Sequence, residues 1–464
     1  MFSSESIRVE MSERTRAVAW GGLSVVRQLL QRLQVAQEID ASVSVLRRHH
    51  PFHESDHVLS LVFNLLTGGR TIEDIERRRT DLAFLDAVGA RRVPGATTAG
   101  DFLRRFEDGD VIDLLEASLA IGKRAWKGKR GKDQATIDID GTIAEVHGEC
   151  REGADMAYNG KWGYGPLLVS LANSSEVLYV ENRPASCPSH VGAPEILDRC
   201  AEACLDRGFD SVLFRGDTAF SSIAHLDRWD QKGYRFVFGM KAHAKALALA
   251  EGLKEGDFRR LVRPTRNSDE TRARLFNHRS LFVAEKEYKN LELEEEHVAE
   301  VPYSTRRCKR EFRVIILRKR IKVSEGQRLL EPETRYFFYI TNLPKGSHGP
   351  AEIVAESNQR CHQEKLIEQL KNQLPAMRMP TKSLVANWAY LAIGCLAWNL
   401  TAWLTLFIPK KIRPSFARRD FRSFYHDLML IPAQILRTGR RTIFRLLGYK
   451  ETLPWLLAAH RAVS

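Results

Sequence analysis

The order of strand-like and helix-like runs between residues 131 and 241 restricts the fold more than any other feature of the chain. Three strand-like runs come first, and helix-like and strand-like runs then alternate. In chain order the runs are ATIDIDGTIAEVHG, YGPLLVSLANSS, EVLYVENRP, PEILDRCAEACLDRG, SVLFRGDTAF, IAHLDRWDQKG and YRFVFGMK. Successive strands followed by alternating helices and strands indicate a mixed α/β sheet.

The segments on either side have different patterns. Residues 1–130 read as helical, with Ser55 and Asp56 as candidate N-caps and the pair Gly68–Gly69 as a stop. Residues 242–335 are charge-rich and contain short strand-like runs such as SLFVAEKEY and EFRVIILRKR. Because YRFVFGMK before them and RYFFYITNLP after them both read as sheet strands, this material is predicted to be an insertion into the sheet.

Charge and cysteine usage restrict the partners and the compartment. Lys and Arg total 71 against 58 Asp and Glu, which gives a net charge of +13, and the pI is about 9.4. This excess favours a polyanionic partner, nucleic acid before membrane, although an ordinary basic surface is the alternative. The seven cysteines form no CxxC pair, and Cys200 and Cys204 read as the buried side of a helix. We therefore expect free thiols and a cytoplasmic protein.

Residues 384–409 form one uncharged run that is long enough to cross a bilayer. Its tryptophans and asparagines are spread along the run instead of gathering at its ends. A helix that is apolar all round is also typical of a protein core, so we predict a buried core helix and no membrane partner.

Two apolar runs carry carboxylates where chemistry is expected. In TIDIDGT, Asp138 and Asp140 alternate with apolar residues and so project from the same face of one strand. In LFRGDTAF, Asp217 ends another apolar run, at the carboxyl end of a strand, where binding groups tend to lie in open α/β sheets. Each also has a structural explanation, because Asp140 precedes Gly141 in a possible turn and Asp217 is a possible helix cap.

The stretch NQRCHQEKLIEQLKN, residues 358–372, reads as a helix with four charged residues on one face. These are Arg360, Glu364, Glu368 and Lys371. A solvated helix face has the same appearance. Together with the two strand carboxylates, however, the helix supplies the oxygen ligands that hard divalent cations prefer. Such ions activate a water or a 3′-hydroxyl in phosphodiester chemistry, and the two cations could contact nucleic-acid phosphates beside them.

These motifs in this order resemble those of the DDE transposases of bacterial insertion sequences. The helix resembles the signature Tyr-x2-Arg-x3-Glu-x6-Lys of the subgroup with a β-rich insertion, except that Ser357 stands at the Tyr position. DIDGT resembles the first-Asp motif, FRGDTAF resembles the second, and residues 153–175 are similar to the second-strand region. The likeness covers roughly residues 95–445, and the ordered combination is specific where each motif alone is weak.

The resemblance implies the roles of the site residues. Asp140, Asp217 and Glu364 are expected to hold two Mg²⁺ ions, with Mn²⁺ as a substitute. Asp138 is the alternative ligand on the strand, and Glu368 is the alternative on the helix. Arg360 and Lys371 are expected to bind DNA. The enzyme is expected to bind terminal inverted repeats, to cut double-stranded DNA, and to join the 3′-OH ends to target DNA, as a homodimer on the bacterial nucleoid.

The resemblance also implies the fold: an α/β protein with an RNase H-like mixed sheet, flanking helices, a β-rich insertion and a helical N-terminal domain. We predict five segments: a helical DNA-binding domain (1–130), the first part of the catalytic core (131–241), the insertion (242–335), the second part of the core with the catalytic helix (336–408) and a basic C-terminal region (409–464). Two alternatives are a catalytically silent DNA-binding descendant and an RNase H-like nuclease.

Overall fold

The computed structural model contains two compact units. It describes residues 9–10, 12, 15–129, 131–148, 150–221, 223–262, 289–305, 308–325, 328–409, 420–439, 441–448 and 450–464. The first unit comprises residues 1–130, 141–187 and 365–464, and the second comprises residues 131–140 and 188–364. Each unit is thus assembled from segments that are far apart in the chain. The five consecutive segments expected from the sequence stay a prediction.

The N-terminal part of the first unit is mostly helical. Its elements are α1 (Leu23–Arg32), α2 (Val35–Ser42), α3 (Glu54–Leu66), the 3₁₀ helix η1 (Ile72–Asp74), α4 (Ile75–Arg79), α5 (Leu82–Val88), α6 (Ala96–Leu103) and α7 (Asp108–Trp126). The predicted stop is confirmed, since α3 ends just before Gly68, whose φ of +83° suits glycine. The predicted cap is wrong: His53 precedes the helix, and its backbone N–H donates to Asp56 over 2.9 Å.

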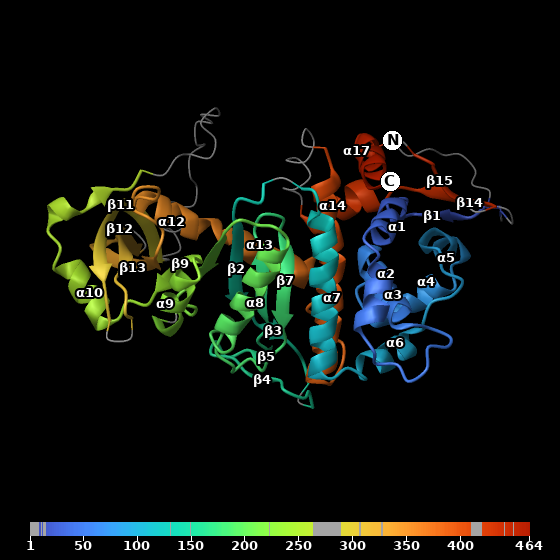
Figure 1. Cartoon of the computed structure of the whole chain (residues 1–464), viewed down its shortest axis with the longest axis horizontal. Coiled ribbons are helices and arrows are strands. Elements are labelled where there is room, and N and C mark those ends of the chain that lie inside the picture. The colour runs from blue at the N-terminus through green and yellow to red at the C-terminus, as the bar shows by residue number, and fades with distance from the viewer. Residues whose placement is uncertain are drawn as a thin grey trace. The chain divides into compact units, whose positions relative to one another are not determined.

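The long apolar run forms α14 (Leu384–Phe407) in the first unit, where it lies beside α7 and also packs on α3 (Figure 1). By length and hydropathy this helix could span a membrane, but 89% of its most apolar window is buried inside the protein. Its polar groups are satisfied within the fold. The side chain of Asn399 accepts from the backbone N–H of Val177 over 2.7 Å and donates to its carbonyl over 2.8 Å. This burial is typical of a core helix.

Strands from distant parts of the chain complete the first unit. They are β1 (Ala17–Val18), β3 (Ala144–Glu145), β4 (Asp155–Met156), β5 (Trp162–Tyr164), β6 (Leu167–Leu171), β7 (Glu176–Glu181), β14 (Ala433–Thr438) and β15 (Arg441–Leu446). Strands β6 and β7 form an antiparallel hairpin, and β7 packs on α7 and α14. Strand β1 pairs with β14, which pairs with β15, so the N-terminal and C-terminal regions share a sheet. The remaining elements are α16 (Phe421–Phe424), the π-helical η3 (Tyr425–Met429) and α17 (Leu453–Val463).

The second unit is built on a mixed sheet with the strand order β10-β11-β12-β13-β9-β8-β2. Strands β2 (Ala135–Gly141), β8 (Val212–Gly216) and β9 (Arg235–Met240) are parallel, and helices α8 (Ala193–Asp206) and α9 (Ile223–Gln231) lie between them in sequence. The predicted mixed α/β architecture is confirmed. Helix α12 (Pro350–Gln359) packs on the sheet through Ile353 and Val354, which join a core cluster with strand residues Leu213, Val237, Val298, Ile315 and Leu317.

The segment predicted to be inserted enlarges this sheet. It contains α10 (Ala244–Glu251), the 3₁₀ helix η2 (Glu255–Asp257), β10 (Arg259–Arg260), β11 (Lys289–Tyr303) and β12 (Phe312–Glu325), and β13 (Arg328–Thr341) begins in it and continues into the core strand predicted after it. Strands β11 to β13 are 14 or 15 residues long, where the sequence indicated short strands. The predicted strand SLFVAEKEY lies outside the described residues. Strand β13 pairs antiparallel with β9, and β10 to β12 extend the sheet beyond β13. That this segment is an insertion stays a prediction.

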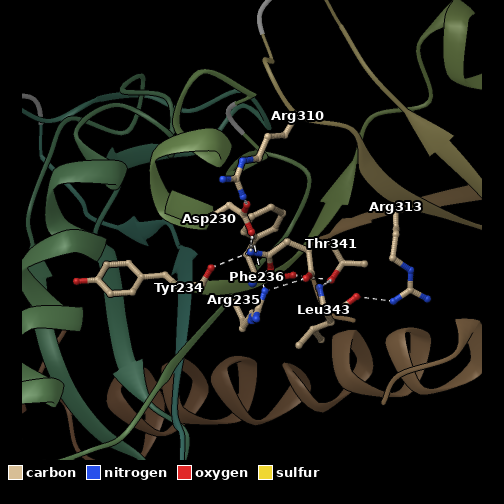
Figure 2. A network of polar contacts seen from close by, with 9 residues as sticks. Asp230, Tyr234, Arg235, Phe236, Arg310, Arg313, Thr341 and Leu343 are labelled. Carbon is tan, nitrogen blue, oxygen red and sulfur yellow. Dashed lines mark hydrogen bonds and ion pairs between the residues drawn. The ribbon is translucent and has the colours of Figure 1, made fainter. Parts of the chain in front are cut away.

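Side chains at the end of β13 attach the insertion to the parallel strands (Figure 2). The amide of Asn342 donates to the carbonyl of Tyr234 and to the carboxylate of Asp230, each over 2.8 Å, and accepts from the backbone N–H of Phe236 over 2.9 Å. The hydroxyl of Thr341 donates to the carbonyl of Phe236 over 2.7 Å. Arg310 from the insertion forms an ion pair with Asp230. The insertion is therefore fixed to β9 and to α9 by polar contacts in addition to the strand pairing.

Candidate active site

Two of the three predicted carboxylates lie at the carboxyl ends of neighbouring parallel strands. Strands β2 and β8 are in register from Ala135 opposite Val212 to Ile139 opposite Gly216. The next residue on each strand is Asp140 and Asp217, respectively. Because adjacent strands are about 4.8 Å apart, this register places the two aspartates side by side. Asp217 also accepts the backbone N–H of Ala219 over 2.8 Å, which fixes the turn that follows the strand.

The third carboxylate, Glu364, lies in the first turn of α13 (Cys361–Asn372). The sequence predicted one uninterrupted helix across Arg360, and this is wrong. Helix α12 ends at Gln359, Arg360 is its C-cap, and α13 starts at the next residue. The backbone of Arg360 stays in the right-handed helical region, with φ −58° and ψ −16°, so the chain turns only locally. The spacing of Arg360 and Glu364 on neighbouring turns is therefore preserved.

Arg360 connects the first and third carboxylates. Its Nη1 lies 3.0 Å from Oδ2 of Asp140, and its Nη2 lies 3.8 Å from Oε1 of Glu364. Asp140 and Arg360 are largely buried, whereas the Glu364 side chain is 60% exposed. The Arg360 guanidinium thus offsets the negative charge of two carboxylates, one on β2 and one on α13. Arg360 thus joins Asp140 to Glu364, while Asp217 is placed beside Asp140 by the strand register alone.

Lys371, at the end of α13, holds the chain that follows β2. Its Nζ donates to the hydroxyl of Thr142 over 2.6 Å and to the carbonyl of Ile143 over 2.7 Å. Arg360 and Lys371 therefore make specific contacts inside the protein, which would not be expected if they were ordinary charges on a solvent-exposed helix face. Glu368 is exposed, and its carboxylate accepts from the amide of Asn372 over 3.3 Å. No described contact joins Glu368 to the aspartates.

Asp138, the alternative ligand on β2, lies in a buried ion pair. Both of its oxygens accept from Arg215 on β8, over 2.6 and 2.7 Å, and the side chains are 1% and 2% exposed. Arg215 also donates to Oε1 of Glu356 on α12 over 2.9 Å. Burial alone lowers the pKa of Arg215, but the hydrogen bonds and charges of Asp138 and Glu356 outweigh it and raise the pKa. This geometry favours a structural role for Asp138.

Sequence reasoning missed Arg215 and Glu356. The signal for Arg215 was present in the strand register, because Asp138 lies opposite Arg215 in the pairing of β2 with β8. Each of the two residues stands two positions before a motif aspartate, inside an apolar strand. An acidic residue and a basic residue at the same sequence spacing before the two motif aspartates are expected to lie opposite each other when the two strands pair in parallel. Glu356 carries no comparable signal, since an isolated glutamate on a helix is common.

The three carboxylates fit a divalent metal site. All of their side-chain ligand atoms are carboxylate oxygens, the type that Mg²⁺ and Mn²⁺ prefer. The aspartates come from adjacent strand ends, and the glutamate is within reach of the same guanidinium as Asp140. Arg360 supplies the positive charge that such a group of carboxylates requires. The donor set therefore matches a site for phosphoryl transfer.

Comparisons with known proteins identify the family of the chain. Residues 3–460 match the family described as Transposase DDE domain group 1. No curated protein matches the chain. Among solved structures, the chain is similar to the cryo-EM structure of the piggyBac transposase synaptic complex with hairpin DNA, with 11% sequence identity and a TM-score of 0.42 over 90% of this chain and 82% of that chain. Because the family match spans nearly the whole sequence, the chain belongs to the DDE transposases, which cleave and join DNA.

Proposed function

We propose that this transposase binds the terminal inverted repeats of its own insertion sequence, cleaves the DNA there and joins the 3′-OH ends to target DNA. The active site consists of Asp140, Asp217 and Glu364 with two Mg²⁺ ions, for which Mn²⁺ substitutes. The observation that carries the proposal is the register of β2 and β8, which aligns the two aspartates, together with the guanidinium shared by Asp140 and Glu364.

The proposal includes an RNase H-like core. Its support is the parallel set β2, β8 and β9 with α8 and α9 between the strands, and the aspartates at the carboxyl ends of β2 and β8. The long antiparallel strands β11 to β13 enter the chain between the second aspartate and the glutamate. This is the position at which the related subgroup is expected to carry its insertion. We also propose a homodimer on DNA, because an element has two ends to be processed.

The chain's own residues have separate roles in this site. Asp140, Asp217 and Glu364 hold the metals, which when bound activate the attacking oxygen and stabilise the leaving oxygen of a phosphodiester. Arg360 pairs with Asp140 in the structure. If Asp140 held a metal, the Arg360 guanidinium would be available to bind a DNA phosphate through two N–H groups. Lys371 holds the loop at Thr142 and Ile143, directly after the first aspartate's strand.

If Arg360 and a metal ion compete for Asp140, Arg360→Ala should change Mn²⁺ affinity and cleavage rate in opposite directions. In the absence of DNA, the variant should bind Mn²⁺ more tightly than the unchanged protein, because Asp140 loses a competing cation. Cleavage should nevertheless be slower, because a scissile phosphate displaced by about 1 Å loses its alignment with the site. Calorimetric Mn²⁺ titration and a cleavage assay on one end fragment measure both effects. Weaker Mn²⁺ binding by the variant would show that Arg360 does not compete for Asp140.

A second test asks whether Arg360 and Lys371 contact DNA or are ordinary surface charges. If Arg360 and Lys371 each contact one phosphate, Arg360→Ala and Lys371→Ala should each lower the slope of log affinity against log salt by about one. Lys345→Ala is the control, because Lys345 is 78% exposed and its described contact is a distant pair with Glu300 at 3.7 Å. Gel-shift titrations over a range of salt concentrations give the slopes. Slopes equal to that of Lys345→Ala for both variants would exclude these residues from the DNA interface.

A further inference from the structure

A second group of possible metal ligands lies in the first unit, at the start of α3. His49, His53 and Glu54 each place one ligand atom within 4.8 Å of the others. The three residues come from the loop that precedes the helix and from its first residue. Both imidazoles are exposed, whereas Glu54 is buried. None of these residues belongs to the carboxylate site of the second unit.

Glu54 is a buried carboxylate whose two oxygens point to the loop before α3. Its side chain is only 2% exposed, and an ionised carboxylate is costly to bury without a partner. Oε1 accepts the backbone N–H of Leu46 over 3.1 Å, and Oε2 lies 3.2 Å from Nδ1 of His49. His49 is the one ion-pair partner recorded for Glu54 in the described part of the chain, and it is charged only when protonated.

The second histidine lies next to the first. The rings of His49 and His53 are stacked, with centroids 5.5 Å apart and an angle of 14° between their planes. This arrangement keeps both imidazoles within ligand distance of the Glu54 carboxylate. Imidazole nitrogens and carboxylate oxygens are ligands that one divalent cation can share, so the three side chains are placed to hold a single ion.

From this geometry we infer that His49, His53 and Glu54 form a binding site for a first-row transition metal, with Zn²⁺ as the best fit. Two imidazole nitrogens and one carboxylate oxygen are ligands that Zn²⁺ accepts in tetrahedral sites, whereas Mg²⁺ prefers oxygen ligands alone. The three residues leave a fourth position for water. Small movements of the two exposed imidazoles bring the ligand atoms, now up to 4.8 Å apart, to coordination distance.

The metal would fix the loop at residues 43–53 to the first turn of α3. The next histidine along the helix, His57, has a different role. Its ring is stacked on Phe102 of α6, with centroids 4.4 Å apart, and burial lowers its pKa to about 4. His57 therefore stays neutral and packs the helix against α6. The proposed metal site would thus hold the first turn of α3 to the preceding loop, and the stacking of His57 on Phe102 holds the next turn to α6.

The test is Zn²⁺ binding by tag-free, EDTA-treated protein, measured by isothermal calorimetry. His49→Ala and His53→Ala should each weaken Zn²⁺ binding by about 100-fold or more, because even outer-shell partners of a metal contribute about 10–100-fold. His50→Ala is the matched control, since His50 is an exposed histidine between the two ligands that is not part of the group. The carboxylate site of the second unit is intact in all three variants, so it contributes equally to each titration.

A Co²⁺ titration gives an independent readout. The unchanged protein and His50→Ala should develop the visible absorption bands of tetrahedral Co²⁺, and His49→Ala should not. Glu54→Gln should also lose the bands, but its buried position makes misfolding a separate risk, so the two exposed histidines decide the result. The inference is overturned if the unchanged protein fails to bind Zn²⁺ at micromolar concentration. It is equally overturned if His49→Ala and His53→Ala bind Zn²⁺ as tightly as His50→Ala does.

Discussion

Asp140→Ala, Asp217→Ala and Glu364→Ala are each expected to abolish DNA strand cleavage while leaving the binding of the end DNA largely unchanged. Each substitution removes a proposed metal ligand, whereas the affinity for DNA depends on phosphate contacts made elsewhere. Because outer-shell partners of a metal already contribute about 10–100-fold to activity, loss of a direct ligand should reduce the cleavage rate by more than about 100-fold. Gel-shift and Mg²⁺-dependent cleavage assays on the same end fragment measure the two properties separately.

Glu368→Ala is the matched control for the glutamate. Glu368 lies one turn beyond Glu364 on α13, is exposed, and has Asn372 as its described contact. It should therefore keep nearly full cleavage. If Glu368→Ala is inactive and Glu364→Ala is active, the third ligand is assigned to the wrong residue. Cleavage at the normal rate by Asp140→Ala or Asp217→Ala would remove that aspartate from the site.

The features that follow a local pattern could be predicted from the sequence. Alternation in TIDIDGT predicted a strand that carries Asp138 and Asp140, and the apolar run before Asp217 predicted a second strand; the structure has both. The uncharged run from residue 384 gave a buried helix, because a helix that is apolar all round has to be covered by protein or lipid. In each case the period of hydrophobic residues determines which face is buried, and that information lies within a few residues.

Features that depend on pairing between distant segments could not be predicted. The sheet of β1 with β14 joins Ala17 to Gln434, and no local pattern indicates that partnership. The contact of Arg360 with Asp140 joins residues 220 positions apart. The break between α12 and α13 was also missed, because no glycine or proline marks it. Such contacts are determined by how distant elements pack against each other, and the residues near each contact do not encode its partner.

The second large effect concerns the buried pair of Asp138 and Arg215, which joins β2 to β8. Arg215→Met should lower the free energy of unfolding of the second unit by about 3–5 kcal/mol, since it leaves the Asp138 carboxylate buried and unpaired. Asp138→Leu should have a similar effect, because among the described residues Arg215 then keeps the partly exposed Glu356 as its one acidic partner. Pulse proteolysis in urea detects the loss as a lower midpoint of unfolding.

The double variant Asp138→Leu/Arg215→Met distinguishes a buried pair from two independent packing defects. Replacing both partners by apolar side chains of similar size is often neutral, so most of the lost stability should return. The two single losses should therefore be strongly non-additive in a double-mutant cycle. If the destabilisation of the double variant equals the sum of the two single losses, the contact between Asp138 and Arg215 does not stabilise the sheet.

A cleavage assay on folded variants tests which aspartate of β2 is the metal ligand. Asp138→Asn should retain measurable cleavage, while Asp140→Asn should not. The opposite result would make Asp138 the metal ligand and Asp140 the residue that holds Arg360.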